Sequence, residues 1–404
     1  MDGVPTTSTI RSDLRVLYAA RGVRGFGDGF AVIILPAYLT AIGFSPFQIG
    51  LIATIALLGS SLLTLLVGFL APRHDLRNLL MLGAGLIVAT GLAFPQFEHI
   101  AYIGLIAFVG TINPQTGDSG ILVPLEHAMM ARGVPDAERT RAFARYSLTG
   151  ALATAAGALA AALPDVLVSA GTGKIAAFQA MFYLYAALGV VGGVLYQRLP
   201  HAQVEQATVS TPLGPSRWTV YKLAALFSLD SFAGGFTVQS LMALWLFERF
   251  DLSLSAASLF FFWTSVLSAF SFPMAAWLAR HIGLINTMVY THIPSSIFLI
   301  LAAFSDNLYV ALGLLLIRSA LAQMDVPARS SYVMAVVTPA ERTAAASVTA
   351  VPRSLASAIS PAFAGMMLGT PLLGLPLVVC GVLKIVYDVA LLFSFRHIKP
   401  PEEI

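Results

Sequence analysis

Charged side chains occur inside long apolar segments of this sequence, where water cannot solvate them. Arg21, Arg24 and Asp28 are spaced at i, i+3 and i+7, which places them on one face of a helix. A charge inside a bilayer costs about 2.5–3.5 kcal/mol on insertion scales, so such residues usually face a cavity or a partner. This face predicts a binding site for an anionic or zwitterionic group. The alternative is an internal Arg24–Asp28 pair that only lets the helix insert.

A second charged face occurs in the segment 307–337. Arg318, Asp325 and Arg329 recur there at i, i+7 and i+11, and Gln323 is nearby. Since the spacing again selects one side of a helix, we predict that Arg318, Gln323 and Asp325 bind substrate.

Two further apolar segments carry isolated polar groups. The segment 219–247 contains Asp230 and Gln239, which we add to the predicted binding residues. In the segment 99–131, polar or helix-breaking residues crowd together: Thr111, Asn113, Pro114, Gln115, Thr116, Asp118 and Ser119. Such a run predicts a helix interrupted against protein or a wet cavity, with Asn113 and Gln115 available to a substrate.

Four intramembrane aspartates are candidate proton carriers: Asp28, Asp118, Asp230 and Asp325. We expect all four to line a space between the two halves of the chain. Asp28 and Asp325 each have an arginine four residues away, which favours a permanently charged carboxylate. Asp118 and Asp230 have no such neighbour, so they are the predicted proton-coupling residues.

The remaining polar residues in apolar segments suggest structural roles. Lys384 and Asp388 are spaced as an i, i+4 pair, and His292 is interpreted as a satisfied buried polar group. The one cysteine, Cys380, lies in an apolar run and excludes a disulfide framework. We expect neither a metal nor a cofactor.

The composition identifies lipid as the solvent. The 404 residues are 57% hydrophobic and 11% charged, with a mean hydropathy of +0.82. Soluble domains carry about 25% charged residues. The net charge of +3 is small and the basic residues are scattered, which argues against nucleic acid as a partner. The first fifteen residues lack a signal-peptide pattern, so we expect the first apolar segment to be a mature span.

Apolar runs of about 20 residues predict twelve membrane spans. They cover 16–42, 46–71, 77–96, 99–131, 139–164, 174–198, 219–247, 253–279, 283–304, 307–337, 339–368 and 372–395. The only long polar break, 199–218, divides them into six and six. Basic residues in the loops number 14 on one side and 2 on the other, which predicts cytoplasmic termini and a cytoplasmic linker.

The two halves repeat each other in sequence. GDGFAVIILPAYL at 27–39 aligns with AGGFTVQSLMALW at 233–245, an offset of 206 residues. VPLEHAMMARGVPDAERTRA at 123–142 aligns with VPARSSYVMAVVTPAERTAA at 326–345, an offset of 203. Because each repeat holds six spans, both run in the same direction, and their symmetry axis lies along the membrane normal.

With twelve spans, a 6+6 repeat and a cytoplasmic linker, the chain resembles the major facilitator superfamily over nearly its whole length. The loop after the second span keeps Gly68, Arg73 and Arg77 of the family motif, but Pro72 replaces its acid and Asp75 its second glycine. The resemblance implies an all-α membrane fold of twelve transmembrane helices in two pseudo-symmetric six-helix bundles. The implied domains are 1–198 and 219–404, joined by the linker 199–218.

The resemblance also implies that spans 1, 4, 7 and 10 line a central cavity, and these spans carry most of the buried charges. Arg139 and Arg342 occupy equivalent cytoplasmic loops and are expected to tie loops together, and Arg73 and Arg77 are expected in the cytoplasmic loop after the second span. The repeat aligns Glu126 with Arg329. We predict that they form a gate that pairs only in the outward-open state, the alternative being a partner for each within its own half.

These features predict a monomeric secondary transporter in a bacterial inner membrane. It would move a small solute by alternating access, with proton-coupled efflux as one option. Uptake, uniport and lipid transport remain alternatives within the same fold. An intramembrane aspartyl protease is the alternative from another class, because Gly25-Phe-Gly27-Asp28 and Tyr387-Asp388 match its short motifs. Those motifs occur here in reversed order and ten spans apart, so we expect no enzyme.

Overall fold

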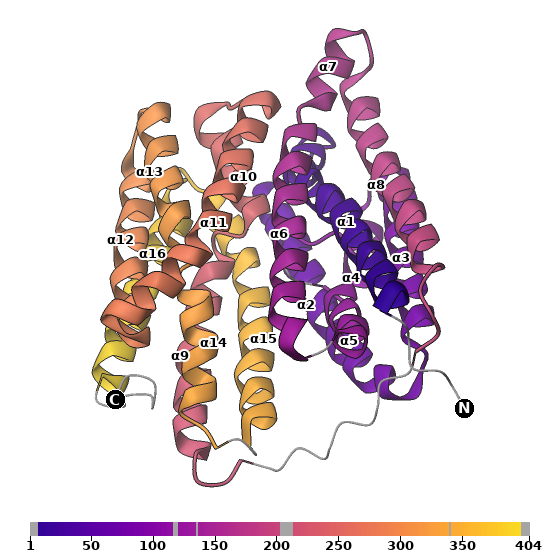
Figure 1. Ribbon diagram of the computed structural model, residues 1–404. Coiled ribbons are helices and arrows are strands. Elements are labelled where there is room, and N and C mark those ends of the chain that lie inside the picture. Colours follow the sequence, from indigo (N-terminus) through magenta and orange to yellow (C-terminus); the bar gives the residue numbers. More distant parts are fainter. Residues whose placement is uncertain (1–6, 116–119, 135, 203–212, 339–340, 397–404) are drawn as a thin grey trace. The chain divides into compact units, whose positions relative to one another are not determined.

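Apolar segments of this length fold as helices because a bilayer leaves no other partner for the backbone amides. The computed structural model describes residues 7–115, 120–134, 136–202, 213–338 and 341–396, without the side chains of 7–12, 72, 133, 136, 137, 139, 140 and 343. These parts of the chain are helical with short connections and contain no strand (Figure 1).

The chain forms two compact units, each described here by itself. The first consists of Met1–Phe44, Ile55–Ala207 and Ser253–Phe262, and the second of Ser45–Thr54, Thr208–Leu252 and Trp263–Ile404. The earlier helices are α1 (Thr7–Ala41), α2 (Pro46–Leu70), α3 (Leu76–Ala93), α4 (Ile100–Val109), α5 (Leu122–Gly133), α6 (Asp136–Ala160), α7 (Leu163–Ser169) and α8 (Lys174–Tyr196), with 3-10 turns η1 (Ala71–Arg73) and η2 (Phe94–Gln96). The later helices are α9 (Arg217–Gly235), α10 (Gln239–Phe250), α11 (Leu254–Ile282), α12 (Leu284–Phe304), α13 (Leu308–Leu321), α14 (Asp325–Ala335), α15 (Arg342–Leu368) and α16 (Leu375–Phe395).

The predicted spans agree with these helices except where a span is broken. The interruption predicted in 99–131 is confirmed, because α4 ends at Val109 and α5 begins at Leu122. Two further breaks were not predicted. One separates α9 from α10 at 236–238, and the other separates α13 from α14 at 322–324.

Nine of the helical stretches in the described parts of the chain are long and apolar enough to cross a membrane. The predicted spans 4, 7 and 11 are not among them. Span 4 is divided into the short helices α4 and α5, α9 of span 7 contains Arg217, Lys222 and Asp230, and α15 of span 11 contains Arg353 and several serines. The chain is therefore an integral membrane protein, and the count of twelve stays a prediction.

Helix packing in the second unit follows that of the first. α1 packs on α6 and α8, and α3 packs on α8; likewise α9 packs on α15 and α16, and α12 packs on α16. Close approaches between helices also recur at aligned positions. A Cβ atom on Gly29 would lie 2.2 Å from the Thr154 carbonyl oxygen, and one on Gly235 would lie 2.0 Å from the Ser360 hydroxyl. Both helix pairs therefore need a glycine at the same place in the repeat.

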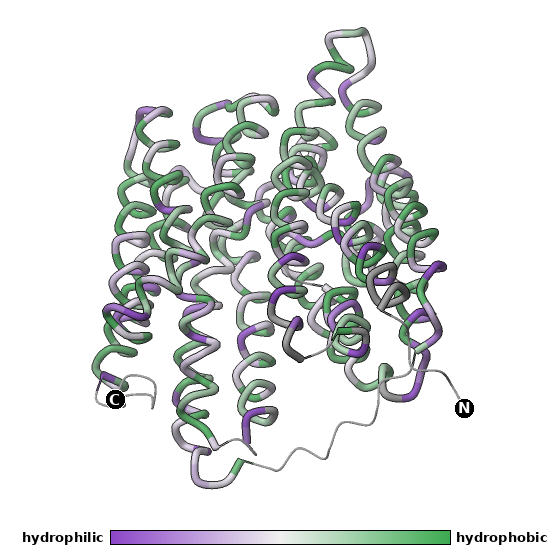
Figure 2. The backbone as a smooth tube through the Cα atoms, in the orientation of Figure 1, coloured by the Kyte–Doolittle hydropathy of each residue, from purple (hydrophilic) through white to green (hydrophobic). Residues whose placement is uncertain are grey.

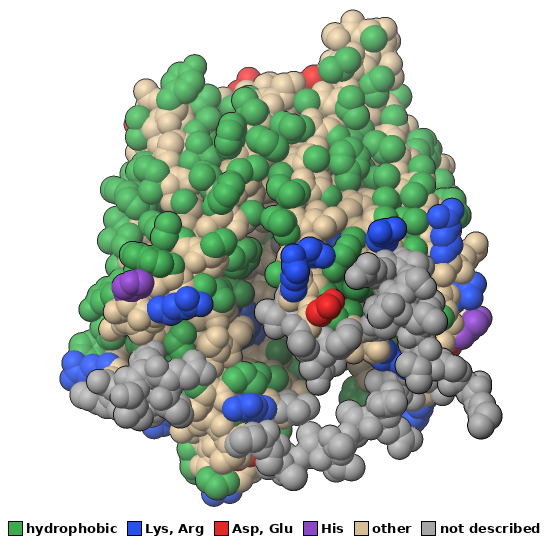
Figure 3. All heavy atoms as spheres, viewed as in Figure 1, with side chains coloured by type: hydrophobic (Ala, Val, Ile, Leu, Met, Phe, Trp, Pro, Cys, Tyr) green, Lys and Arg blue, Asp and Glu red, His purple; other side chains and the backbone are tan. Residues whose placement is uncertain are grey.

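The outer helix faces are apolar. Phe69, Phe270, Phe304 and Tyr309 are each more than 70% exposed. Hydrophobic backbone segments run along the length of the helices, and polar segments gather at helix ends and connections (Figure 2). On the face seen in Figure 3, hydrophobic side chains cover most helices and blue Lys and Arg side chains gather toward the lower end. Exposed apolar surface of this extent indicates contact with lipid.

Candidate functional site

The first unit contains a buried carboxylate that accepts bonds from three side chains. Glu126 on α5 is fully buried, and its Oε2 atom lies 2.6 Å from the Nη2 atom of Arg24 on α1. The Tyr146 hydroxyl on α6 donates to the same oxygen, and the Tyr196 hydroxyl on α8 donates to Oε1 at 2.6 Å. Charge-assisted hydrogen bonds are stronger than neutral ones. Side chains from four helices, α1, α5, α6 and α8, therefore meet at this one ion pair.

Arg21 lies one turn before Arg24 and is buried beside the same tyrosine. Its guanidinium carbon is 5.4 Å from the centre of the Tyr146 ring, within the range of a cation–π contact. The neighbouring helix, α6, has no room for a side chain at this point, because a Cβ atom on Gly150 would lie 2.3 Å from the Nε atom of Arg21. Arg21 and Arg24 therefore share one buried surface of α6, as their spacing predicts.

A polar pocket opens beside this centre, at the break between α4 and α5. The space between its atoms amounts to about 470 Å³, open solvent included, and Arg24 and Asp28 form part of its wall. The Tyr185 hydroxyl bonds to Asp28 and lies 3.3 Å from the Thr111 hydroxyl. The other lining residues are Ser60, Ile87, Gly110, Asn113, Gln115, Gly120, Ile121 and Leu122. Carboxylate, guanidinium, amide and hydroxyl groups together suit a ligand with both donors and acceptors.

The break supplies two of these groups through its local geometry. The backbone N–H of Gln115 donates to the Oδ1 atom of Asn113 at 2.9 Å, which closes an Asx turn. The helix therefore ends at Val109. The irregular backbone that follows places Asn113 and Gln115 together at the pocket. Asn113 and Gln115 were both predicted to bind substrate.

The second unit contains a larger buried charge network. The Oδ2 atom of Asp230 on α9 lies 3.0 Å from Arg329 on α14, and its Oδ1 atom lies 2.7 Å from the Nζ atom of Lys384 on α16. Arg329 also pairs with Asp325 at 3.1 Å, one turn away. Asp230 was predicted as a carboxylate without a neighbour in sequence. Folding gives it two cations from helices about 100 and 150 residues distant.

The network extends through a histidine to a third carboxylate. His292 on α12 lies 3.0 and 3.1 Å from the two carboxylate oxygens of Asp388 through Nδ1, and 3.2 Å from the Nζ atom of Lys384 through Nε2. Lys384 and Asp388, predicted from their spacing as a structural pair, therefore take part in a larger network. Both face partners on other helices, because α16 packs on α9 and α12.

The two units carry equivalent ion pairs of opposite polarity. Arg24 aligns with Asp230 and Glu126 aligns with Arg329 in the sequence repeat. The first unit thus pairs a cation on α1 with an anion on α5. The second pairs an anion on α9 with a cation on α14. The structure gives Glu126 and Arg329 each a partner within its own unit, which was the alternative to the predicted gate.

The other predicted residues have separate surroundings. Arg318 is near the end of α13, Gln323 is exposed in the break before α14, and Gln239 begins α10. Asp118 lies outside the described residues, as does the side chain of Arg139.

Two acidic residues make hydrogen bonds within the loops that were predicted to be cytoplasmic. Asp75 caps α3 by accepting the N–H of Asn78 at 3.1 Å, and it also accepts the N–H of Ala202 at 2.8 Å. Glu341 accepts the N–H of Gly214 at 2.6 Å. Of the predicted cations, Arg77 contacts His201 at 3.2 Å, Arg73 ends η1, and Arg342 is exposed at the start of α15.

Sequence reasoning missed the aromatic and histidine partners of the charges. Tyr146, Tyr185 and Tyr196 gave no pattern distinguishable from ordinary core aromatics. Lys384 and His292 were noticed, but only their position in the fold shows that they meet Asp230.

These features define a polytopic membrane protein with buried charge centres in two repeated units. A model of the Major Facilitator Superfamily matches residues 17–317, and the chain belongs to that family. The uncharacterized membrane protein YJR124C of Saccharomyces cerevisiae is 25% identical over 421 residues, covering 95% of this chain and 94% of its own.

Solved structures share the fold at low identity. A bacterial homolog of the human lysosomal transporter Spinster aligns with a TM-score of 0.75 at 16% identity, covering 97% of this chain and 98% of its own. The nucleoside transporter NupG gives 0.73 at 14% identity, over 95% of this chain and 99% of its own. The peptide transporter PepTSo gives 0.73 at 11% identity, over 95% and 98%.

Proposed function

We propose that this protein is a secondary active transporter that moves a small polar solute with an anionic or zwitterionic group. The proposal includes twelve spans in two six-helix bundles, 1–198 and 219–404, joined by the linker 199–218. Alternating access between the bundles would expose the site to each side of the membrane in turn. Membership of a family of transporters supports transport over the protease alternative.

The pocket beside Asp28 is the observation that carries this proposal. It combines the charges of Asp28 and Arg24 with the amides of Asn113 and Gln115. Buried polar groups of this kind are costly in a membrane and usually mark a substrate path. The structural neighbours include transporters named for nucleosides and peptides, which are also small solutes rich in donors and acceptors.

Proton coupling and orientation are parts of the same proposal. Asp118 and Asp230 remain the predicted coupling residues, and Glu126 with Arg329 remains the predicted gate. The excess of basic loop residues supports cytoplasmic termini and a place in a cytoplasmic membrane. In proton-coupled efflux, the pH gradient would drive release of the solute from the site. A uniporter would need no gradient.

The test is solute flux in proteoliposomes with and without a pH gradient. A panel of nucleosides, dipeptides and organic acids is screened by counterflow, and the strongest solute is then studied in variants. Asp28→Asn is expected to lower its transport about tenfold or more, because a charged hydrogen bond is worth about 1.5–3 kcal/mol. Glu98→Gln, an exposed acid in the same unit, serves as the matched control. Equal flux in Asp28→Asn and wild-type protein would contradict the assignment of this pocket.

A further inference from the structure

Asp28 on α1 is a half-buried carboxylate in the wall of the pocket at the break between α4 and α5. The Tyr185 hydroxyl donates to it, because a carboxylate only accepts. Among the described residues, no cation forms a close ion pair with Asp28, and Arg24 and Arg21 act on its charge from a greater distance. A carboxylate has about four acceptor positions, so Asp28 has further positions to offer in the pocket.

The two arginines near Asp28 are already held by other groups of the protein. Arg24 donates through Nη2 to Glu126 at 2.6 Å and to the Tyr146 hydroxyl at 2.9 Å. Arg21 is only 2% exposed, and its guanidinium carbon lies 5.4 Å from the centre of the Tyr146 ring. The cations of this unit are therefore bound within the fold, whereas the carboxylate of Asp28 is available to a cation from outside.

The sequence repeat distinguishes Asp28 from the charges that support the fold. The ion pair of Arg24 has a counterpart in the second unit, the pair of Asp230 and Arg329. Asp28 instead aligns with Gly234, which has no side chain. Since the repeated helix packing is kept without a carboxylate at this position, packing does not account for Asp28.

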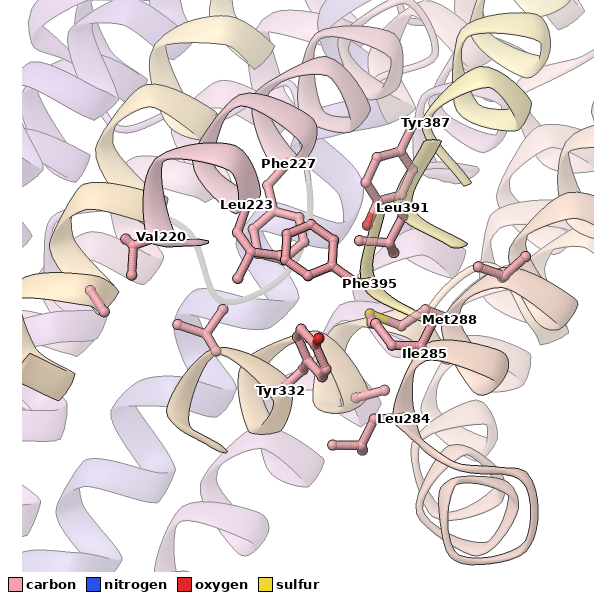
Figure 4. Packing of buried hydrophobic residues seen from close by; sticks show 14 of the residues in the cluster. Val220, Leu223, Phe227, Leu284, Ile285, Met288, Tyr332, Tyr387, Leu391 and Phe395 are labelled. Atoms are coloured by element: carbon pink, nitrogen blue, oxygen red, sulfur yellow. The ribbon is translucent and has the colours of Figure 1, made fainter. Parts of the chain in front are cut away.

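The counterpart pair of the second unit lies against a packed core. The guanidinium carbon of Arg329 is 5.6 Å from the ring centre of Phe227. Phe227 and Tyr387 belong to the buried apolar cluster of that unit, with ring centres 6.4 Å apart (Figure 4). Arg24 of the first unit borders a polar pocket. The packed cluster supports a structural role for the second pair, and the pocket supports a binding role in the first unit.

The buried charges beside the pocket sum to zero. Arg21 and Arg24 are two cations, and Asp28 and Glu126 are two anions. A solute with a single charge would leave one charge uncompensated in a poorly solvated site, which is costly. A solute with one charge of each sign leaves the sum unchanged. Arg24 also retains a donor for the solute's anionic group, because its buried Nε atom has no acceptor within the described structure.

We propose that Asp28 binds the protonated amine of the transported solute, and that this solute is a small zwitterion with an ammonium and a carboxylate group. Amino acids are the simplest members of this class. The ammonium donates to the acceptor positions that Tyr185 leaves open, and the carboxylate accepts from Arg24. Tyr185, whose hydroxyl lies 3.3 Å from that of Thr111, is a positioning residue for Asp28. This inference rests on the proposed transport function and selects zwitterions from the solute classes named there.

The experiment measures binding to purified full-length protein through the rise of its melting temperature with solute concentration. The probes are the common L-amino acids and alanyl-alanine. The strongest probe is compared with two analogues that keep its side chain, the carboxylic acid without the amine and the amine without the carboxylate. The zwitterion is expected to bind about tenfold or more tightly than either analogue, since each analogue loses a charge-assisted hydrogen bond.

Variants test the role of Asp28 in this preference. Asp28→Asn keeps the shape of the side chain and removes its charge, so it should weaken binding of the zwitterion about tenfold or more. It should strengthen binding of the carboxylic acid without the amine, because the site then carries a net positive charge. Such an inverted preference cannot result from misfolding, which would weaken both. Asp28→Glu should retain the wild-type preference.

Two further variants separate positioning from charge. Tyr185→Phe removes the hydroxyl that donates to Asp28 and should weaken binding of the zwitterion several-fold without inverting the preference. Glu98→Gln, the exposed acid of the same unit, should leave all affinities unchanged.

Three results would overturn the inference. They are the absence of binding by every zwitterion tested, equal binding of the zwitterion and the carboxylic acid without the amine, and a wild-type preference in Asp28→Asn. Flux of a nucleoside or an organic acid in proteoliposomes, with no zwitterion bound, would contradict this inference and leave the proposed transport function in place. Binding of a zwitterion with no flux of any solute would contradict transport and leave the amine site in place.

Discussion

Glu126 shows how much one buried residue determines in the first unit. Its carboxylate is bonded to Arg24, Tyr146 and Tyr196, which come from three helices other than its own. Removing its charge leaves Arg24 buried beside two tyrosines without its ion-pair partner, and Asp28 is the other anion that acts on it. Removing one tyrosine hydroxyl leaves the ion pair and two of the three donors intact.

Glu126→Gln should therefore destabilise the protein far more than Tyr196→Phe. We expect a loss of about 3–5 kcal/mol for breaking the buried ion pair. The loss of one hydrogen bond in Tyr196→Phe should be about 1–2 kcal/mol. Unfolding of the purified protein by a denaturing detergent measures both. Similar losses in the two variants would mean that the Arg24–Glu126 pair contributes little beyond its hydrogen bonds.

The residue scale also shows where sequence reasoning ends. Asp28, Asn113 and Gln115 were selected because polar groups in apolar segments are expensive, and the structure places all three on one pocket. Asp230 was selected for the same reason, but its surroundings were predicted from neighbours four residues away. Its actual partners, Arg329 and Lys384, lie on other helices, and single-helix spacing carries no information about them.

At the scale of elements, the sequence predicts helices well and their breaks unevenly. The break after Val109 follows from seven polar or helix-breaking residues among the nine from Thr111 to Ser119. The breaks at 236–238 and 322–324 have weaker signals, because residues such as Phe236, Val238 and Met324 are apolar. Hydropathy keeps such spans continuous, although the backbone turns within them. These breaks depend on tertiary packing rather than on local composition.

The strength of the contact between the linker and the start of α15 depends on pH. Glu341 accepts bonds from Thr338, Gly214 and Ser216 at the start of α15. The Thr338 hydroxyl and then the Gly214 N–H stabilise the ionised form, which lowers the pKa of Glu341 from its usual range to about 2. Because the folded pKa is depressed, the stabilisation is complete above about pH 4.5 and is lost as the pH falls toward 2.

Glu341→Gln is expected to loosen this contact at neutral pH. Hydrogen exchange at the Gly214 and Ser216 amides should become several-fold faster, because a neutral amide oxygen is a weaker acceptor than a carboxylate. Mass spectrometry of peptides covering 213–220 measures the change, and the exposed Glu98→Gln provides the control. The difference between Glu341→Gln and wild-type protein should shrink below pH 4.5. Equal exchange at pH 7 would show that the carboxylate does not hold the linker.

At the scale of the whole molecule, the repeat preserves helix pairing and reverses charge. α1 with α6 and α9 with α15 keep the same glycine-dependent packing, so shape is retained between the units. The ion pairs at aligned positions keep their geometry as pairs but exchange sign. A duplicated site with inverted polarity gives one unit a buried arginine where the other has a buried aspartate.

Charge swaps distinguish pairs within a unit from a gate between units. Arg24→Glu and Glu126→Arg should each be strongly destabilising, and the double variant should recover part of the loss, with a coupling of about 0.5–3 kcal/mol. Asp230→Arg with Arg329→Asp should recover less, because the new arginine would face Lys384. Glu126→Arg with Arg329→Glu exchanges charges between units and should give additive losses of stability, since each residue loses its local partner. Detergent unfolding measures these three cycles.

The gate instead requires that the last double variant, Glu126→Arg with Arg329→Glu, regain solute flux relative to its single variants. Stability recovery in that variant, with none in Arg24→Glu/Glu126→Arg, would show that the local pairs are not what holds these charges in the protein.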